Sequence, residues 1–155
     1  MPHSPRARAT GGAALDARED FARARRAHAF ARSARWFAGL RRHRTDPTCG
    51  PCTQPLGGGR SRLVVLSLAA GRGAIEPSAG FDADFRPVSE SVRTRWERIA
   101  LAHRQGVALS PISVVACPDG YYVLDGRHRV SVALALGHED IDAWVSRPLR
   151  RERPA

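Results

Sequence analysis

The feature that most constrains the fold is a strand, a tight turn and a helix in immediate succession. Residues 121–124 are aromatic and branched, which favours a strand, and Asp125-Gly126 then favours a turn. From Arg127 the apolar residues recur at helical spacing as far as Gly137, which suits the left-handed position after a helix. A further strand is expected at residues 141–145. The order strand, turn, helix, strand is therefore predicted here.

The junction between this strand and helix predicts an anion site. Glycine allows the chain to turn sharply, and the first helical turn leaves backbone N–H groups without partners. Basic side chains at a helix start oppose the dipole preference, so a bound anion would offset their cost. The alternative is a basic turn that is merely solvated. The predicted phosphate-binding residues are Asp125, Gly126, Arg127, His128 and Arg129.

The preceding residues predict the rest of a small α+β domain. An apolar run at residues 63–68 favours a buried strand, and Ser89 is a suitable N-cap for a core-packing helix that ends at Gly106. A strand at residues 112–116 and a hairpin turn at residues 118–120 then lead back to the opening strand.

The N-terminal part of the chain predicts a basic helix. Residues 1–62 hold 13 arginines against 4 acidic residues, which is 9 of the net charge of +10. Residues 1–15 are expected to be disordered, and residues 16–42 form an amphipathic helix with Phe30, Ala34, Phe37 and Leu40 on one face. This helix packs on its own domain, on nucleic acid, or on another partner. The arginines predicted to contact nucleic acid are Arg23, Arg25, Arg26, Arg32, Arg35, Arg41 and Arg42.

Proline and glycine make residues 43–61 a predicted linker, followed by a domain at residues 62–147 and a basic tail at residues 148–155. Cys49 and Cys52 in the linker stand in a Cys-Gly-Pro-Cys sequence, but its flanks do not predict the strand and helix that a redox motif needs. A zinc site with His43 would lack a fourth ligand unless Cys117 or another His joins it. We therefore expect an incidental pair, no metal site and no framework of disulfides.

Acidic side chains in the loop before the Ser89 helix are candidates for chemistry. Asp82 and Asp84 are two carboxylates at a spacing that suits a metal or a general base, if the loop folds over the anion site. The favoured interpretation is structural: they solvate a loop that Phe81 and Phe85 anchor. The candidate catalytic residues are His128, Asp125, Asp82, Asp84 and Glu76.

The order of elements and the Asp-Gly-Arg-His-Arg turn resemble the ParB/sulfiredoxin superfamily, which includes the N-terminal nucleotide-binding domain of partition proteins. The resemblance covers residues 62–145. It implies a small mixed sheet packed against helices, here preceded by the basic helix. In that family, a glycine and the basic residues after it hold nucleotide phosphates, and Gly126, His128 and Arg129 occupy the matching positions.

Three departures from the family pattern bear on activity. Arg127 stands where sulfiredoxins have their catalytic cysteine and where partition proteins have Glu, which argues against reduction of sulfinic acids. Ser131 stands where a further basic residue is usual. The Glu-Asn and Arg motif of partition proteins and their helix-turn-helix domain have no counterpart in the sequence, which argues against a CTP-driven clamp.

The resemblance implies a nucleotide- or phosphate-binding protein, with CTP, ATP or ADP and Mg²⁺ as the cofactors, and the basic helix adds non-specific DNA association. One alternative is a small-molecule phosphotransferase or phosphohydrolase, since the superfamily includes an ADP-dependent kinase of free serine. Another is a protein-interaction module whose phosphate site is vestigial. No run of residues is long and apolar enough for a membrane span, so a cytoplasmic protein is expected. The sequence does not predict an oligomeric state.

Overall fold

The structure, a computed structural model, describes residues 6–38, 61–76, 78–117 and 120–147. Most of the predicted linker, the tail at residues 148–155, and Cys49, Cys52, Arg41 and Arg42 lie outside these ranges. The side chains of residues 6–10, 32–38 and 72 are also outside the description, so the predicted roles of Arg32 and Arg35 are not tested.

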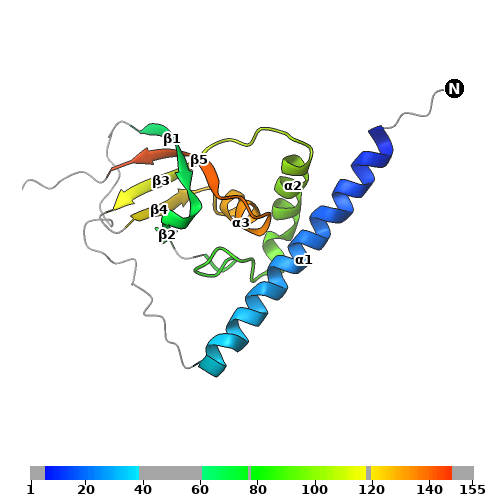
Figure 1. Cartoon of the computed structure of the whole chain (residues 1–155), viewed down its shortest axis with the longest axis horizontal. Helices are drawn as coiled ribbons and strands as arrows, with labels where there is room; N and C mark the ends of the chain where they lie inside the picture. Colours follow the sequence, from blue (N-terminus) through cyan, green and yellow to red (C-terminus); the bar gives the residue numbers. More distant parts are fainter. Residues whose placement is uncertain (1–5, 39–60, 77, 118–119, 148–155) are drawn as a thin grey trace, which may run out of the picture.

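The chain folds as an α+β domain with one five-stranded mixed sheet (Figure 1). The strands are β1 (Arg62–Ser67), β2 (Gly71–Ala74), β3 (Ile112–Cys117), β4 (Gly120–Asp125) and β5 (Asp140–Ser146), and the helices are α1 (Arg6–Ala38), α2 (Arg93–Arg104) and α3 (Arg127–Ala135). Short 3₁₀ turns span Leu68–Ala70 and Glu90–Val92.

The strand order is β1-β5-β3-β4-β2. Antiparallel pairing joins β1 to β5 and β3 to β4, whereas β3 with β5 and β2 with β4 are parallel. Cys117 lies opposite Gly120, in agreement with the predicted hairpin. The short strand β2 was not predicted, because Gly71 and Gly73 have no side chains and so cannot show the alternation of apolar and polar residues that indicates a strand. Its pairing with β4 is a tertiary contact that local propensity does not encode.

The helices lie in succession beside the sheet (Figure 1). Helix α3 contacts β5 and α2, and α2 in turn contacts α1. Two clusters of buried side chains form the core. The helix cluster consists of Ala17, Phe21, Ala24, Phe81, Val92, Trp96, Ala100 and Val132. The sheet cluster consists of Leu66, Phe85, Ile112, Val114, Val123, Val130 and Ala143.

Helix α1 begins at Arg6, ten residues before the predicted start at Asp16. The sequence before Asp16 holds good helix formers such as Ala7 and Ala9, which allow a helix to propagate past the two glycines at residues 11–12. At 1.5 Å per residue, the 33 residues of α1 span about 50 Å. The helix is therefore much longer than α2 and extends beyond it, as Figure 1 shows.

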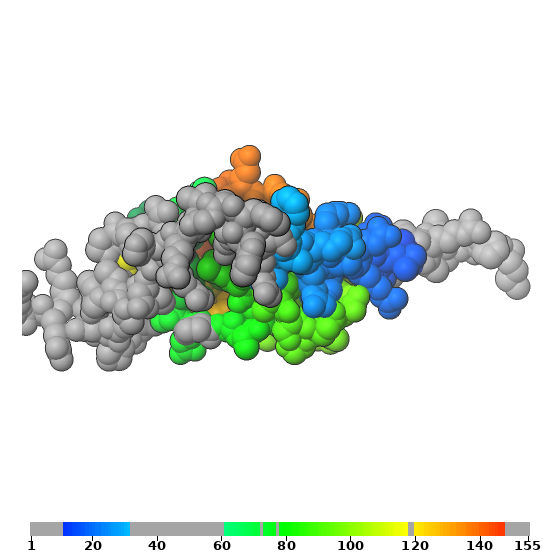
Figure 2. Space-filling model, turned by 90° about the horizontal axis from the view of Figure 1, so that it is seen from below, coloured from blue at the N-terminus to red at the C-terminus, as the bar shows by residue number. Residues whose placement is uncertain are grey.

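Helix α1 packs on its own domain, and Phe30, the one side chain of the predicted apolar face that the structure describes, takes no part in this packing. Phe30 is 76% exposed, whereas Ala17, Phe21 and Ala24 are buried against α2. The small alanines let the two helix backbones approach, and the ring of Phe21 meets that of Trp96 edge-on at 5.5 Å between centroids. The space-filling view shows α1 and α2 side by side (Figure 2).

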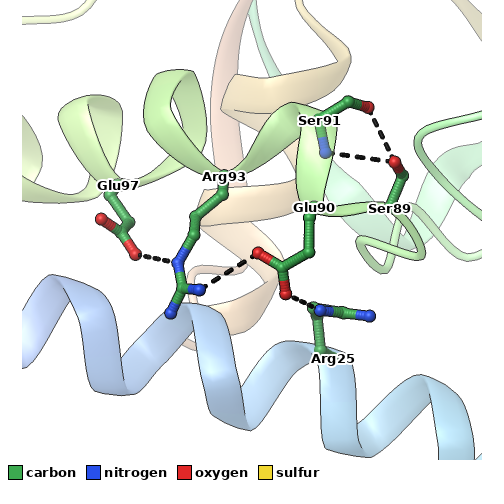
Figure 3. A network of polar contacts seen from close by, with 6 residues as sticks. All are labelled: Arg25, Ser89, Glu90, Ser91, Arg93 and Glu97. Atoms are coloured by element: carbon green, nitrogen blue, oxygen red, sulfur yellow. Dashed lines mark hydrogen bonds and ion pairs between the residues drawn. The ribbon is translucent and has the colours of Figure 1, made fainter.

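Polar contacts complete the docking of α1 on the domain (Figure 3). Arg25 of α1 pairs with Glu90, which also holds Arg93, and Arg93 in turn pairs with Glu97. The Ser89 side chain accepts the Ser91 N–H at 3.1 Å, so the predicted cap is formed at the 3₁₀ turn that leads into α2.

Candidate anion site at the start of α3

The turn into α3 has the backbone that the sequence predicts. Gly126 has a φ of 104°, in the left-handed region, and it is the N-cap of α3. A Cβ atom placed on Gly126 would lie 2.5 Å from Cγ2 of Ile112. Glycine is therefore required here both by the backbone dihedral and by the close approach of β3.

The first turn of α3 presents backbone donors. The first bond of the helix runs from the Val130 N–H to the Gly126 carbonyl at 3.0 Å, so the N–H groups of Arg127, His128 and Arg129 precede the helical ladder. Gly126 provides no side-chain cap for them. These donors and the helix dipole favour an anion at this position.

Arg129 differs from its predicted role as a phosphate ligand. Its guanidinium donates to the carbonyls of Ser110 and Pro111 at 2.6 and 2.7 Å and to the Asp125 carboxylate at 2.9 Å. The side chain is only 15% exposed. Arg129 therefore holds the segment before β3 against the end of β4, and its donors in this structure serve the fold.

Arg127 leaves part of its guanidinium unused. One terminal nitrogen donates to the Glu76 carbonyl at 2.9 Å and lies 4.0 Å from the Glu76 carboxylate, which is 84% exposed. The Nε atom of Arg127 is buried and has no hydrogen-bond partner. A buried N–H without an acceptor is costly, so this atom has donor capacity that a ligand oxygen can satisfy.

His128 lies at the centre of a cationic group. Burial lowers its pKa, and the charges of Arg95 and Arg127 lower it further, whereas Asp125 raises it. The imidazole packs edge-on against Phe81 at 4.9 Å between centroids. Arg95, on α2, was not predicted for this site, because its position beside His128 depends on how α2 packs against α3.

Asp82 and Asp84, the acidic candidates of the 81–87 loop, make contacts within the loop and to α1. Asp82 accepts the N–H groups of Asp84 and Arg86 on one oxygen, at 2.9 and 2.8 Å, and contacts Nδ1 of His28 on α1 at 2.7 Å with the other. The Asp84 carboxylate pairs with Arg86. Phe85 takes a φ of 59° inside this loop, and its ring is buried in the sheet cluster.

These contacts bear on the chemistry open to the site. A general base must reach a proton on the substrate, and Asp82 already accepts hydrogen bonds on both oxygens. Asp125 is engaged with Arg129. Among the described residues, no group of three or more His, Cys, Asp or Glu side chains could hold a metal ion. The contacts therefore favour binding of an anion over proton transfer to or from it.

The arginines predicted to contact nucleic acid divide into two groups within the described part of α1. Arg23 pairs with Asp20 within α1, whereas Arg25 pairs with Glu90 and so contributes to docking of the helix. Arg26 is exposed.

Cys117 at the end of β3 is disulfide-bonded, a pairing that the sequence did not predict. Its partner lies outside the described residues. A single pair is not a framework of the kind that stabilises small secreted domains. Within the ranges that the structure covers, no helix is long and apolar enough to cross a membrane.

Comparison with solved structures finds a likeness in fold, whereas the two sequence comparisons find no match. No protein-family model matches the sequence, and no curated protein matches it. A crystal structure of sulfiredoxin from Arabidopsis thaliana is similar, with a TM-score of 0.43 and 21% sequence identity, over 56% of this chain and 85% of that chain. The likeness concerns the fold, a mixed sheet with helices beside it.

Proposed function

We propose that the start of α3 binds the phosphate group of a ligand, and that a nucleotide such as CTP, ATP or ADP is the class of ligand it takes. The observation that carries the proposal is the buried Nε of Arg127, which has no hydrogen-bond partner, in a first helical turn whose N–H groups receive no side-chain cap from Gly126. Arg95 adds positive charge from α2, and the His128 imidazole, whose lowered pKa favours its neutral form, adds an N–H donor from α3. Such a group of donors suits the oxygens of a phosphate.

Magnesium would be carried in by the phosphates of such a ligand. Mg²⁺ is commonly held by one or two carboxylates together with substrate phosphates, and Asp125 is the carboxylate nearest in sequence to the turn. Among the described residues, no cluster of three or more His, Cys, Asp or Glu side chains could bind the ion without the ligand. We therefore expect Mg²⁺ to strengthen nucleotide binding and to show no binding of its own.

The test is calorimetric titration of the full chain with pyrophosphate, ADP, ATP and CTP at low ionic strength, with and without Mg²⁺. The Arg127→Gln variant should lose about tenfold or more in affinity, as expected for a charge-assisted hydrogen bond of about 1.5–3 kcal/mol. Arg98→Gln, an exposed arginine on α2, is the matched control. Absence of binding to all four ligands would leave the interaction-module alternative as the better account.

Phosphoryl transfer is the other use of such a site, and the same preparation tests it. Release or transfer of phosphate from ATP or CTP, lost in a His128→Asn variant that still binds nucleotide, would establish an enzyme. The engagement of Asp82 and Asp125 in structural contacts favours binding without turnover.

Non-specific DNA association is the second part of the proposal, and it rests on a separate observation. The excess of 9 positive charges lies in residues 1–62, and Arg18 and Arg26 of α1 are exposed. Binding of this kind weakens steeply as salt rises. Fluorescence anisotropy of a labelled duplex at two salt concentrations tests it, and salt-independent binding or none would count against it.

A further inference from the structure

A cavity of about 610 Å³ lies where helix α1, the 83–87 loop, α3 and the core face of the sheet meet. Its wall includes Ala24 of the helix cluster and several members of the sheet cluster, so the cavity lies between the two parts of the core. Small-molecule sites occupy about 300–1,000 Å³. The cavity is therefore large enough for a small organic ligand.

This cavity is separate from the anion site at the start of α3. The helix contributes Val130, Ser131, Leu134 and Ala135 to the wall, whereas residues 127–129 do not line it. The two sites therefore use different parts of one helix. Binding in the cavity does not depend on binding of a phosphate at the turn.

The strands give the cavity an apolar wall. Leu66 of β1, Ile112 and Val114 of β3, and Val123 of β4 line it, and all four belong to the sheet cluster. Water beside such a wall finds few hydrogen-bond partners, and an empty space deprives the wall of dispersion contacts. Both effects favour an occupant with an apolar body.

The charged side chains that line the cavity balance one another. Two are acidic and two are basic: Asp20, Asp84, Arg23 and Arg86. Asp20 pairs with Arg23 at 3.2 Å and with Arg104, outside the lining, at 2.7 Å. Asp84 pairs with Arg86 at 2.8 Å. Each of the four therefore has a partner of opposite charge.

The charges just outside the lining do not create an excess of positive charge. Arg104 also lies 3.7 Å from Asp16, and Arg86 lies 3.6 Å from Asp82, so two carboxylates accompany the one additional guanidinium. An ionised ligand would lose its hydration in the cavity and find no unpaired opposite charge there, which is costly. An uncharged ligand avoids this cost.

We propose that this cavity binds an uncharged small molecule whose apolar body packs against the sheet cluster. An aliphatic alcohol has this chemistry. A carboxylate or an ammonium group on the same aliphatic chain weakens binding, because the charged side chains of the lining are already paired with one another. A shorter chain also weakens binding, because it covers less of the apolar wall.

Octan-1-ol, octanoate and octylammonium are the probes, titrated separately at neutral pH into the full chain with labelled valine and leucine methyl groups and followed by NMR. Octan-1-ol should bind saturably and at least fivefold more tightly than either ion, with its largest chemical-shift changes at Val114, Val123 and Val130. Equal or tighter binding of either ion would overturn the uncharged class. Shift changes confined to methyl groups outside the cavity would overturn the position.

Butan-1-ol tests the apolar body of the ligand. It should bind at least tenfold more weakly than octan-1-ol, because it removes less apolar surface from water. Equal affinities of the two alcohols would mean that the apolar wall does not hold the ligand, and would overturn the proposal.

Blocking variants test the site from two helices. Leu134→Trp on α3 and Ala27→Leu on α1 add volume at exposed positions of the lining, so each should weaken octan-1-ol binding at least fivefold while the thermal unfolding midpoint changes little. Ala29→Leu, at an exposed position of α1 outside the lining, is the matched control and should keep the affinity. Unchanged affinity in both folded blocking variants, or no saturable binding of octan-1-ol, would overturn the proposal. Loss of nucleotide binding bears on the α3 turn alone and leaves this result unaffected.

Discussion

The Nε2 atoms of His103 and His138 lie 2.6 Å apart, and this contact joins the end of α2 to the segment between α3 and β5. The rings meet edge-on at 4.3 Å between centroids. At this distance one nitrogen donates and the other accepts, so at least one of the two must carry no proton on its Nε2. The contact is therefore compatible with one shared proton and is disrupted when both nitrogens are protonated.

This pair predicts that stability falls as the solution becomes acidic. Burial lowers the pKa of His103, and the charges of His138 and Arg104 lower it further. Arg129, Asp140 and Asp142 line the same small cavity as the pair. In the unfolded chain the pKa of His103 is about 6.5, so below that pH the unfolded chain binds a proton more readily than the folded protein does. Stability is therefore lost as the pH falls from about 6.5 toward the lower pKa of the folded protein.

The measurement is urea unfolding at pH 7.5 and pH 5.5. The difference in unfolding free energy between the two should be smaller in His103→Gln than in the unmodified protein. A remainder should persist, because the pKa of His128 is also lowered. An identical difference in the two proteins would show that His103 is not responsible.

Alanine at Gly126 should destabilise the fold more than alanine at Gly137. Both glycines have positive φ, 104° and 76°, so both variants incur a strain of about 1–2 kcal/mol. A Cβ atom at Gly137 meets open space, whereas at Gly126 it meets Ile112, which adds about 1–3 kcal/mol of overpacking. Chemical denaturation measures the two variants side by side, and equal losses would contradict the close approach of β3.

Replacement of Ser131 by alanine should cost about 1–3 kcal/mol, because it leaves a buried indole N–H without an acceptor. Nε1 of Trp96 donates to the Ser131 hydroxyl at 2.8 Å, and both residues are buried. If the hydrogen bond is the cause, Ser131→Ala should cost much less in a Trp96→Phe background. A double-mutant cycle of unfolding free energies tests this, and additive losses would point to packing instead.

Asp20 should contribute more to stability than Asp16, although both contact Arg104. The Asp20 carboxylate is 1% exposed and lies 2.7 Å from Arg104, whereas Asp16 is exposed and 3.7 Å away. Asp20→Asn should therefore cost about 1.5–3 kcal/mol, and Asp16→Asn less than about 1 kcal/mol. Thermal and urea unfolding give the comparison. The reverse order would mean that α1 does not dock through Asp20.

The variant Arg129→Lys should show whether Arg129 stabilises the fold or binds the ligand. Lysine keeps the charge but cannot reproduce the fork that reaches the Ser110 and Pro111 carbonyls together with Asp125. Stability should fall by about 1–3 kcal/mol, while pyrophosphate affinity stays within about twofold. The opposite result, unchanged stability with weakened pyrophosphate binding, would mean that Arg129 is a ligand of the anion.

The elements whose cause is local could be predicted from the sequence. Gly126 and Gly137 bound α3 through their positive φ angles, so the turn and the helix are confirmed. Ser89 caps through its own hydroxyl the 3₁₀ turn that precedes α2. The strands β1, β3, β4 and β5 follow from short branched runs in the same way.

The remaining features depend on tertiary contacts between residues that are distant in the sequence. The role of Arg129 is set by carbonyls 18 and 19 residues away, and the burial of Asp20 by Arg104 on another helix. Arg95 joins the site because α2 packs beside α3. The prediction for Phe30 was wrong for the same reason: its hydrophobic size favoured burial, whereas the helix packing buries Ala17 and Ala24 and leaves Phe30 exposed.

The divided core has a consequence for how the protein unfolds. Helix α3 places Val130 in one cluster and Val132 in the other, and the 81–87 loop does the same with Phe81 and Phe85. Neither half can lose its packing without removing side chains from its neighbour. Amide protons of α2 and of the central strands should therefore exchange with solvent through one shared opening reaction, so that the two clusters behave as a single cooperative unit.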